Sequence, residues 1–240
     1  MKKLHLLLLT VVTLSAGVAL AQWKRISGNG NVVTQTRETG TFSEIVVSGS
    51  MQVEVTAAPA IGVQVQAEDN LQEYIVTEVK GNRLQVKFKN GVSINSHKAV
   101  KVLVRMPKLN AASIAGSGSI RSSNQLNSNG QFSATISGSG NVAVQTSATK
   151  VAATIAGSGS IVLGGKTDDL HVVISGSGSF KGYDLAASEA SVQIAGSGDV
   201  EAYASEKLHA AISGSGSVYY KGNASISVKT SGSGKVRKAD

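Results

Sequence analysis

A glycine-serine-glycine corner recurs along the second half of the chain and constrains the fold more than any other feature. Seven segments share a β-branched residue, a small residue, Gly-Ser-Gly, one polar residue and one apolar residue. They are Ile114–Ile120, Ile136–Val142, Ile155–Ile161, Ile174–Phe180, Ile194–Val200, Ile212–Val218 and Thr230–Val236. Their first glycines are 22, 19, 19, 20, 18 and 18 residues apart. A near-constant period of this length predicts a solenoid in which each repeat forms one coil.

The residues before each corner alternate between apolar side chains and small or polar ones. In one copy Leu208, Ala210 and Ile212 are separated by His209 and Ala211, and nearly every copy follows the same order. A period of two with one apolar side is typical of a β-strand that buries one face. A single copy cannot bury that face alone, so neighbouring copies must stack on it. We therefore predict an all-β, single-stranded parallel β-helix, or β-solenoid, with about 18–22 residues per coil in the C-terminal half.

The glycines and serines of the corner have separate expected roles. A sharp corner requires backbone angles that residues with a Cβ adopt only at a cost, which explains the glycines. The serines between them are expected to form a ladder of hydroxyls along one edge of the stack: Ser117, Ser139, Ser158, Ser177, Ser197, Ser215 and Ser233. A degraded eighth copy of the corner lies much earlier in the chain, at Val47–Val53.

The N-terminal half alternates less regularly, and we expect wider, less regular coils over residues 42–106. Gly81-Asn82 separates two alternating runs, which indicates a hairpin. Glu68–Tyr74 is the one segment that fits a helical turn, with Asp69 and Asn70 as candidate capping residues. Asn90–His97 is expected to be a polar loop.

These patterns divide the chain into four parts. They are a signal peptide at 1–21, a lead-in at 22–40, the β-helix domain at 41–236 and a C-terminal tail at 237–240. Trp23 in the lead-in is expected to pack against the first coil. We interpret Thr230–Asp240 as a polar cap, because charges on the last coil of a solenoid hinder edge-to-edge association. The alternative is a flexible tail that ends in a docking signal.

The first 21 residues have the three parts of a secretory signal. Lys2 and Lys3 are basic, Leu4–Ala16 is apolar, and Ala19-Leu20-Ala21 gives the small-residue cleavage pattern. We expect cleavage near Ala21 and export to the periplasm, the outer-membrane surface or the medium. The alternative is a retained anchor, but the apolar run is short for a spanning helix. No second apolar run of spanning length follows, so no membrane span is expected after cleavage.

Composition excludes several classes of function. The chain has no cysteine, which excludes disulfides, thiolate metal sites, a cysteine nucleophile and a lipidated-cysteine anchor. Removing Lys2 and Lys3 lowers the formal net charge from +8 to +6. A mildly basic protein could favour acidic glycans or anionic surfaces, or the charge could serve solubility alone. No run of basic residues interleaved with aromatics is present, so nucleic acid is not an expected partner.

The candidate metal and nucleotide sites lack the residue spacing that such sites need. His171 and His209 share a column two copies apart, so about 9.6 Å would separate their strands, too far for one zinc ion to bridge easily. Asp199 faintly resembles a calcium-binding repeat, but that position holds serine, asparagine or lysine in the other copies. Gly159–Thr167 is one residue out of register with a phosphate-binding loop. We therefore predict no metal and no cofactor.

Candidate catalytic groups are equally sparse. Asp168 and Asp169 are adjacent, so their side chains would point apart on an extended segment, and Glu201 and Glu206 are scattered. General acid–base catalysis needs at least two convergent groups. Tyr219-Tyr220-Lys221 could contact a sugar, although such a pair usually serves packing. No catalytic residue is predicted, and the binding residues stay unknown.

Beyond these residues, the chain resembles a bacterial family, the putative auto-transporter adhesin, head GIN domain, whose function is not known. The resemblance rests on the signal peptide, the early Phe42…Val47-Ser48-Gly49-Ser50…Val53 segment, the Val104-Arg105-Met106-Pro107-Lys108-Leu109 junction and the seven corners. It covers roughly residues 40–236. It implies a right-handed parallel β-helix, a Bacteroidetes-type envelope, and no catalytic residues to carry over.

The expected function is therefore an exported, non-enzymatic β-helix protein of the cell envelope, acting as an adhesin or surface-binding module. Its possible partners are a glycan or another envelope component, and its oligomeric state is open. Two alternatives remain, a polysaccharide-active β-helix enzyme and a periplasmic accessory or sensor protein. A compact acidic cluster on one outer face would favour the enzyme, whereas a face rich in serine and threonine would favour the binding module.

Overall fold

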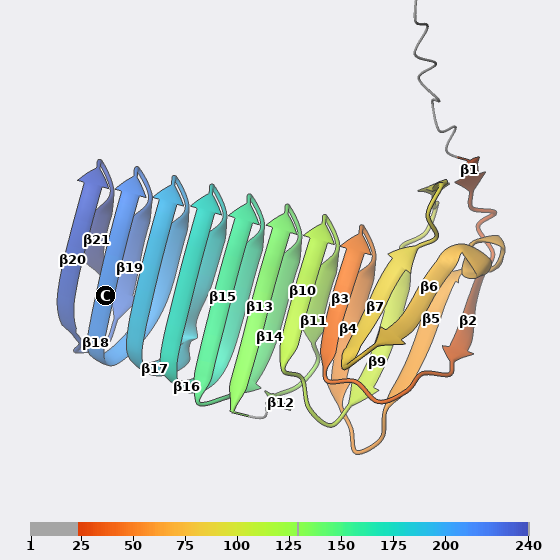
Figure 1. Ribbon diagram of the computed structural model, residues 1–240, viewed down its shortest axis with the longest axis horizontal. Helices are drawn as coiled ribbons and strands as arrows, with labels where there is room; N and C mark the ends of the chain where they lie inside the picture. The colour runs from red at the N-terminus through yellow and green to blue at the C-terminus, as the bar shows by residue number, and fades with distance from the viewer. Residues whose placement is uncertain (1–23, 129, 240) are drawn as a thin grey trace, which may run out of the picture.

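A computed structural model describes residues 24–128 and 130–239, and it is a β-solenoid of stacked coils (Figure 1). Two parallel sheets enclose a narrow core along its length. The front sheet contains, in spatial order, β7 (Arg83–Phe88), β3 (Glu44–Gly49), β10 (Ala111–Gly116), β13 (Gln131–Gly138), β15 (Lys150–Gly157), the second halves of β16 (Ser160–Gly176), β17 (Ser179–Gly196) and β18 (Asp199–Gly214), and β20 (Ser225–Gly232).

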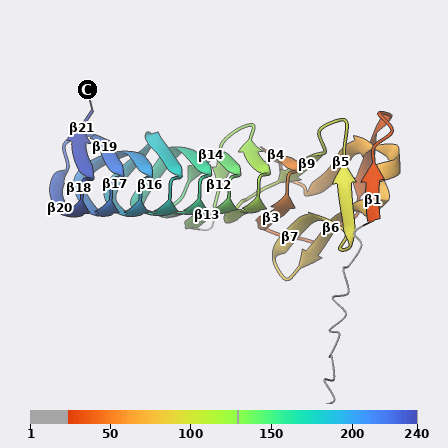
Figure 2. The same ribbon diagram turned by 90° about the horizontal axis from the view of Figure 1, so that it is seen from above.

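The back sheet lies behind it, and the corners connect the two. Its parallel strands are β9 (Lys101–Met106), β4 (Gln52–Ala57), β11 (Ser119–Ser122), β14 (Asn141–Ser147), the first halves of β16, β17 and β18, β19 (Ser217–Lys221) and β21 (Lys235–Lys238). Figure 2 shows the coils narrow toward the C-terminal end and broader at the N-terminal end.

The register of the stack places equivalent residues of successive copies on one another. Ile155 pairs with Ile174, which pairs with Ile194, and the corner glycines align in the same way. The inward column is buried throughout, with Ile174 fully inaccessible to solvent. The predicted β-solenoid and its coil length are confirmed.

The corner glycines have the conformation that the sharp turn requires. The first glycine of every copy has a positive φ, from 119° at Gly176 to 130° at Gly196. A Cβ at Gly138 would lie 2.6 Å from the carbonyl oxygen of Gly116 in the coil before it. The serine that follows donates its backbone N–H to the carbonyl oxygen of the corner glycine in the coil before it, as Ser139 does to Gly116 at 3.0 Å. Glycine is therefore needed both for its φ and for the close stacking of the corners.

The N-terminal half is less regular, as predicted, but its coils are not stacked in chain order. The degraded corner lies on β3 and β4, and Gly49 aligns with Gly116 of the first full copy. The chain then moves outward, so that β7 and β9 cover the other side of the β3–β4 coil before β10 returns beside β3. Three pairings here are antiparallel, joining β2 (Val32–Arg37) to β5 (Gly62–Glu68), β5 to β9, and β6 (Ile75–Lys80) to β7.

The local predictions in this half have mixed outcomes. The hairpin at Gly81-Asn82 joins β6 to β7, and the helical turn is the 3-10 helix η1 (Asp69–Tyr74). The capping prediction is wrong, because η1 has no side-chain cap. The carboxylate of Asp69 instead accepts hydrogen bonds from the amides of Asn29 and Asn31.

The segment expected to be a polar loop, Asn90–His97, contains a strand. β8 (Val92–Asn95) pairs in parallel with β1 (Lys24–Ser27) and forms a small separate sheet. The prediction failed because the pairing partner is far away in the sequence. The short strand β12 (Leu126–Asn127) adds to the edge of β14.

The last coil ends the stack with an uncovered strand. Every residue of β20 is exposed, including Ile226 at 49% and Val228 at 42%. The last coil carries the expected charges, Lys229 and Lys235 among them. Its inward-facing residues Ile226 and Val228 are nevertheless apolar and exposed, because no further coil covers them. The predicted signal peptide, Trp23 and Asp240 lie outside the described residues. Within the described ranges, no helix is long and apolar enough to span a membrane.

Candidate binding surfaces

The outward side of the front sheet, from β15 to β20, carries rows of side chains at fixed positions before each corner. We call this surface the front face. Its first row is charged, because Lys150, Asp169, Glu189 and Lys207 are register partners on successive coils. The Nζ of Lys207 lies 2.6 Å from Oε1 of Glu189, and this hydrogen bond raises the pKa of the lysine. The pair is exposed, so it adds little to stability.

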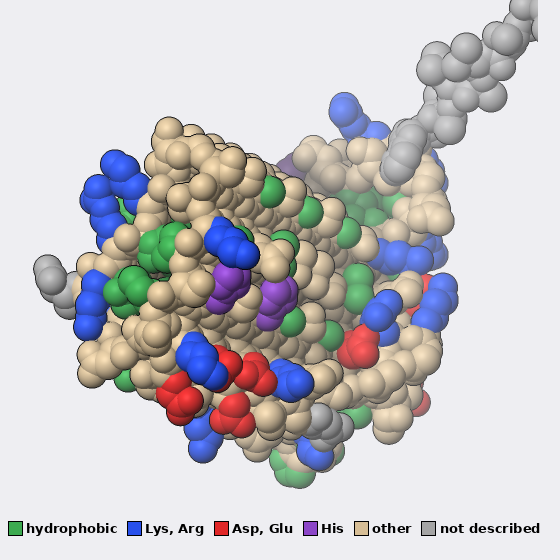
Figure 3. Space-filling model, turned by 60° about the vertical axis from the view of Figure 1, so that its left-hand side comes forward, with side chains coloured by type: hydrophobic (Ala, Val, Ile, Leu, Met, Phe, Trp, Pro, Cys, Tyr) green, Lys and Arg blue, Asp and Glu red, His purple; other side chains and the backbone are tan. Residues whose placement is uncertain are grey.

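The second row of the front face contains both candidate histidines. His171 and His209 are each paired with Ser191, which lies between them on β17, and both are exposed. They are two coils apart, as the sequence predicted. Among the described residues no group of three or more histidine, aspartate and glutamate side chains could hold a metal ion. Histidine, acidic and basic side chains gather on this side of the molecule (Figure 3).

Two shallow grooves run over the outward side of the front sheet, and the larger one extends beyond the front face to β3. One, of about 530 Å³, is lined by Glu44, Lys150, Asp169 and His171 among others. The other, of about 420 Å³, lies nearer the C-terminal end and includes Lys229. These grooves offer scattered charges and small side chains along several coils, which suits an extended ligand better than a small enclosed one.

The adjacent aspartates serve different surfaces. Asp169 lines the larger of the two grooves, whereas Asp168 lines a separate polar cavity with Lys166 and Thr167. The expectation that their side chains diverge on an extended segment agrees with this placement. The structure does bring Asp169 beside Glu189 across the strands, a proximity that sequence reasoning missed because the two belong to different copies.

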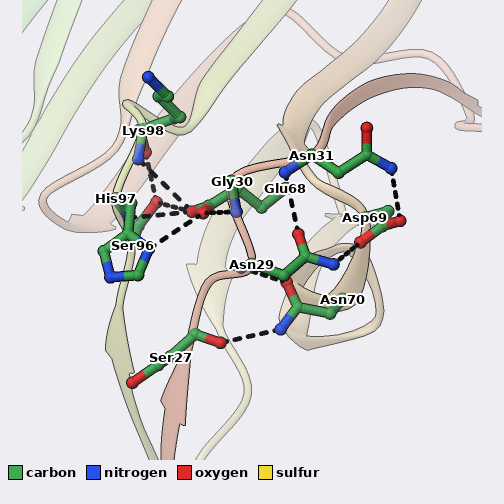
Figure 4. Close-up of polar contacts among 10 residues, drawn as sticks. All are labelled: Ser27, Asn29, Gly30, Asn31, Glu68, Asp69, Asn70, Ser96, His97 and Lys98. Atoms are coloured by element: carbon green, nitrogen blue, oxygen red, sulfur yellow. Dashed lines mark hydrogen bonds and ion pairs between the residues drawn. The ribbon is translucent and has the colours of Figure 1, made fainter.

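A buried carboxylate holds the N-terminal end together. Glu68 is fully inaccessible to solvent and accepts hydrogen bonds from Gly30 N at 2.6 Å, Ser96 Oγ at 2.7 Å and His97 N at 3.0 Å (Figure 4). Burial alone would raise the pKa of Glu68, but these hydrogen bonds and a longer one from Lys98 N outweigh it and leave the pKa lowered. The carboxylate therefore ties the lead-in to the β8–β9 loop and is structural.

The remaining candidates are placed individually. Asp199 is exposed and accepts a hydrogen bond from Ser217 N at 3.1 Å, a local contact between coils. Tyr220 is buried in the core, whereas Tyr219 and Lys221 point outward and are half-buried. The packing expected of the tyrosine pair therefore applies to Tyr220 only.

Comparison with solved structures finds the same fold in proteins from Bacteroides and Parabacteroides species. A structure described as a putative adhesin from Bacteroides fragilis is 25% identical, with a TM-score of 0.84, and covers 89% of this chain and 100% of its own. A putative lipid binding protein from Parabacteroides distasonis is 29% identical, with a TM-score of 0.76, and covers 90% and 100%. A putative adhesin from Parabacteroides merdae, at 20% identity and a TM-score of 0.70, shares the fold over 90% and 100%.

Comparison with families and curated proteins completes these findings. No curated protein matches the chain. The family described as putative auto-transporter adhesin, head GIN domain, matches residues 41–224, which include every described coil except the last. The family resemblance inferred from the repeated Gly-Ser-Gly corners is thereby confirmed. The chain belongs to the putative auto-transporter adhesin, head GIN domain family.

Proposed function

We propose that this chain is an exported, non-enzymatic binding module of the bacterial envelope that acts in attachment. The observation that carries the proposal is the front face, a continuous surface of several coils whose side chains repeat in rows. Rows of this kind can contact an extended ligand or a cell-surface component at many points. The adhesin descriptions of the family and of the Bacteroides fragilis structure support the same function.

The proposed export rests on the N-terminal sequence. The basic Lys2 and Lys3, the apolar Leu4–Ala16 and the small residues before Gln22 form a signal-peptide pattern. The adhesin descriptions of the family and of the Bacteroides fragilis structure agree with a surface location. The mature protein would then begin near Gln22, in the lead-in that Glu68 fastens to the solenoid.

The lipid-binding description of one relative suggests a different ligand for that protein. In this chain side chains from both sheets fill the space between them, and the core runs as one cluster from Phe42 to Tyr220. A lipid would therefore have to lie on an outer surface rather than between the sheets.

Attachment assays test the proposal. A strain that lacks the chain, and the same strain supplied with it, are compared on wells coated with polysaccharides or matrix proteins. We expect the deletion to reduce attachment to at least one coating and the supplied chain to restore it. Equal attachment of both strains to every coating would contradict the proposal.

A second candidate, a polysaccharide-active enzyme, is favoured by one observation. Asp169 and Glu189 are neighbours on the same outer face, with His171 close by in the row above. Glu189 forms an ion pair with Lys207, however, so one of the two carboxylates already has a partner. Release of reducing ends from acidic polysaccharides by the purified chain, abolished by Asp169→Asn, would establish the enzyme and overturn the binding module. We expect no release by either protein.

A further inference from the structure

The outward side of the back sheet carries an aromatic cluster near the C-terminal end. Aromatics make up only 4% of the chain, yet Tyr183, Tyr203 and Tyr219 lie on the successive strands β17, β18 and β19. Tyr219 is the register partner of Glu201, and Tyr203 is the partner of Lys221. We call Tyr183, Tyr203, Tyr219, Glu201 and Lys221 the tyrosine face. It is on the opposite sheet from the front face.

The rings of the tyrosine face are held against the sheet. The Nζ of Lys221 lies 5.1 Å from the centre of the Tyr183 ring, a cation–π contact that spans the strand between them. All three tyrosines are half-buried. Burial raises the pKa of Tyr183, and the nearby Glu201 and Tyr219 raise it further, so these groups lie close together. The result is an ordered platform of aromatic and polar groups.

The strand register breaks at the segment that holds the first ring. β17 and β18 pair regularly up to Gly182 and Ala202, and then shift so that Ala186 pairs with Tyr203. Tyr183 lies in this irregular segment. Its ring contacts Lys221, which lies two coils away.

Cations surround this platform. Lys181 pairs with Glu201 on one side, and Arg237 pairs with Tyr219 on the other. Lys235 lies on the same last strand as Arg237 and pairs with Ser217, which in turn pairs with Asp199. With Lys221, four cations lie near three carboxylates, those of Asp199, Glu201 and the exposed Asp184 next to Tyr183. The excess of positive charge favours a ligand that carries negative charge.

We propose that the tyrosine face binds an anionic polysaccharide, one whose sugars carry carboxylate or sulfate groups. The half-buried phenol rings offer flat apolar faces for the C–H faces of sugar rings, with hydroxyl groups at their edges. Lysine and arginine would bind the acidic groups through charge-assisted hydrogen bonds. Glu201 would accept hydrogen bonds from sugar hydroxyls. This inference rests on the proposed function as a binding module and adds the place and the ligand class.

A membrane surface is the less suitable partner. Tyrosines that anchor proteins at membranes act from the headgroup level, where their rings must reach beyond the protein surface. Here the rings are half-buried, and Glu201 and Asp199 lie among them.

Binding of the purified mature chain to defined probes tests the inference. The probes are polygalacturonate and dextran sulfate, with uncharged dextran and phosphatidylglycerol vesicles as comparisons. We expect binding to at least one acidic polysaccharide, weakened by added salt, and none to dextran. Tyr219→Ala and Lys221→Gln should each weaken binding at least about fivefold, a typical loss for an aromatic or cation–π contact.

The chain provides a matched control at its other end. Lys89 lies over the ring of Tyr74 at 5.7 Å, so Tyr74→Ala removes a similar cation–π pair far from the tyrosine face. This variant should bind as the wild type does, and melting curves identify any variant that is misfolded. Binding to vesicles alone, or equal losses in Tyr74→Ala and Tyr219→Ala, would overturn the inference. So would a lack of polysaccharide binding, whereas the attachment assay would still decide the proposed function independently.

Discussion

The corner glycine is the residue on which the stack depends most. Gly138 has φ 124° and meets the backbone of the preceding coil, so any side chain there is strained in two ways. Gly138→Ala should lower the free energy of unfolding by about 1–3 kcal/mol. Gly40→Ala is the control, because Gly40 has neither a positive φ nor an atom within 4 Å of the added Cβ. Equal denaturation midpoints for the two variants would refute the role of the corner.

The isoleucine column is the second determinant at this scale. Ile174 is fully buried, and Ile174→Asp would leave an unpaired charge between the sheets, with an expected loss of about 3–5 kcal/mol. Ser177 is exposed at the corner, so Ser177→Ala should be mild. Thermal denaturation followed by circular dichroism compares the two, and an unchanged melting curve for Ile174→Asp would mean that the column is assigned incorrectly.

Glu68 makes the N-terminal end sensitive to acid. Its pKa is lower in the folded chain than the ordinary value of 4.5, so the unfolded chain binds the proton more readily. Its stabilising contribution is complete above that value and is lost as the pH falls through the folded pKa. Glu68→Gln should lower the melting temperature at pH 7, and the gap to the wild type should narrow toward pH 3. A gap that stays constant with pH would contradict an ionised Glu68.

At the scale of elements, the repeat made most of the fold predictable. Ile155, Ile174 and Ile194 occupy the same position before each corner, so a local pattern also reports the long-range pairing between coils. The N-terminal half lacks this property. The degraded corner links β3 to β10, but no repeated pattern in the sequence links β3 to β7 or β8 to β1.

The binding surfaces were less predictable than the coils that carry them. Tyr183, Tyr203 and Lys221 each follow the first glycine of their copy by seven residues, a signal that aligning the copies would have revealed. The register shift after Gly182, the segment that holds Tyr183, is not encoded by the spacing. The Glu68 network was hidden because its donors, Gly30 on one side and Ser96 and His97 on the other, come from two segments far from Glu68 in the sequence.

At the scale of the whole molecule, the open end of the stack must be kept from associating. The described part of the last coil carries cations and no acidic residue, while Ile226 and Val228 are exposed beside a strand edge that has no neighbour there. Charge repulsion between two such ends opposes pairing of their unpaired edge strands. Replacing Lys229, Lys235 and Lys238 by glutamine should therefore raise the average mass measured by light scattering.

A control triple variant at Lys24, Lys98 and Lys166 removes the same charge from exposed positions elsewhere. It should leave the average mass unchanged. If both triple variants associate equally, net charge rather than the protected end keeps the molecules apart.

The central claim is that the solenoid presents its binding surfaces outside the cell. Protease treatment of intact cells of the source organism, followed by detection of the chain in each cell fraction, tests this most directly. We predict that the chain is degraded on intact cells while periplasmic proteins stay protected. Complete protection until the outer membrane is opened would contradict the attachment function and would direct the search toward partners within the envelope.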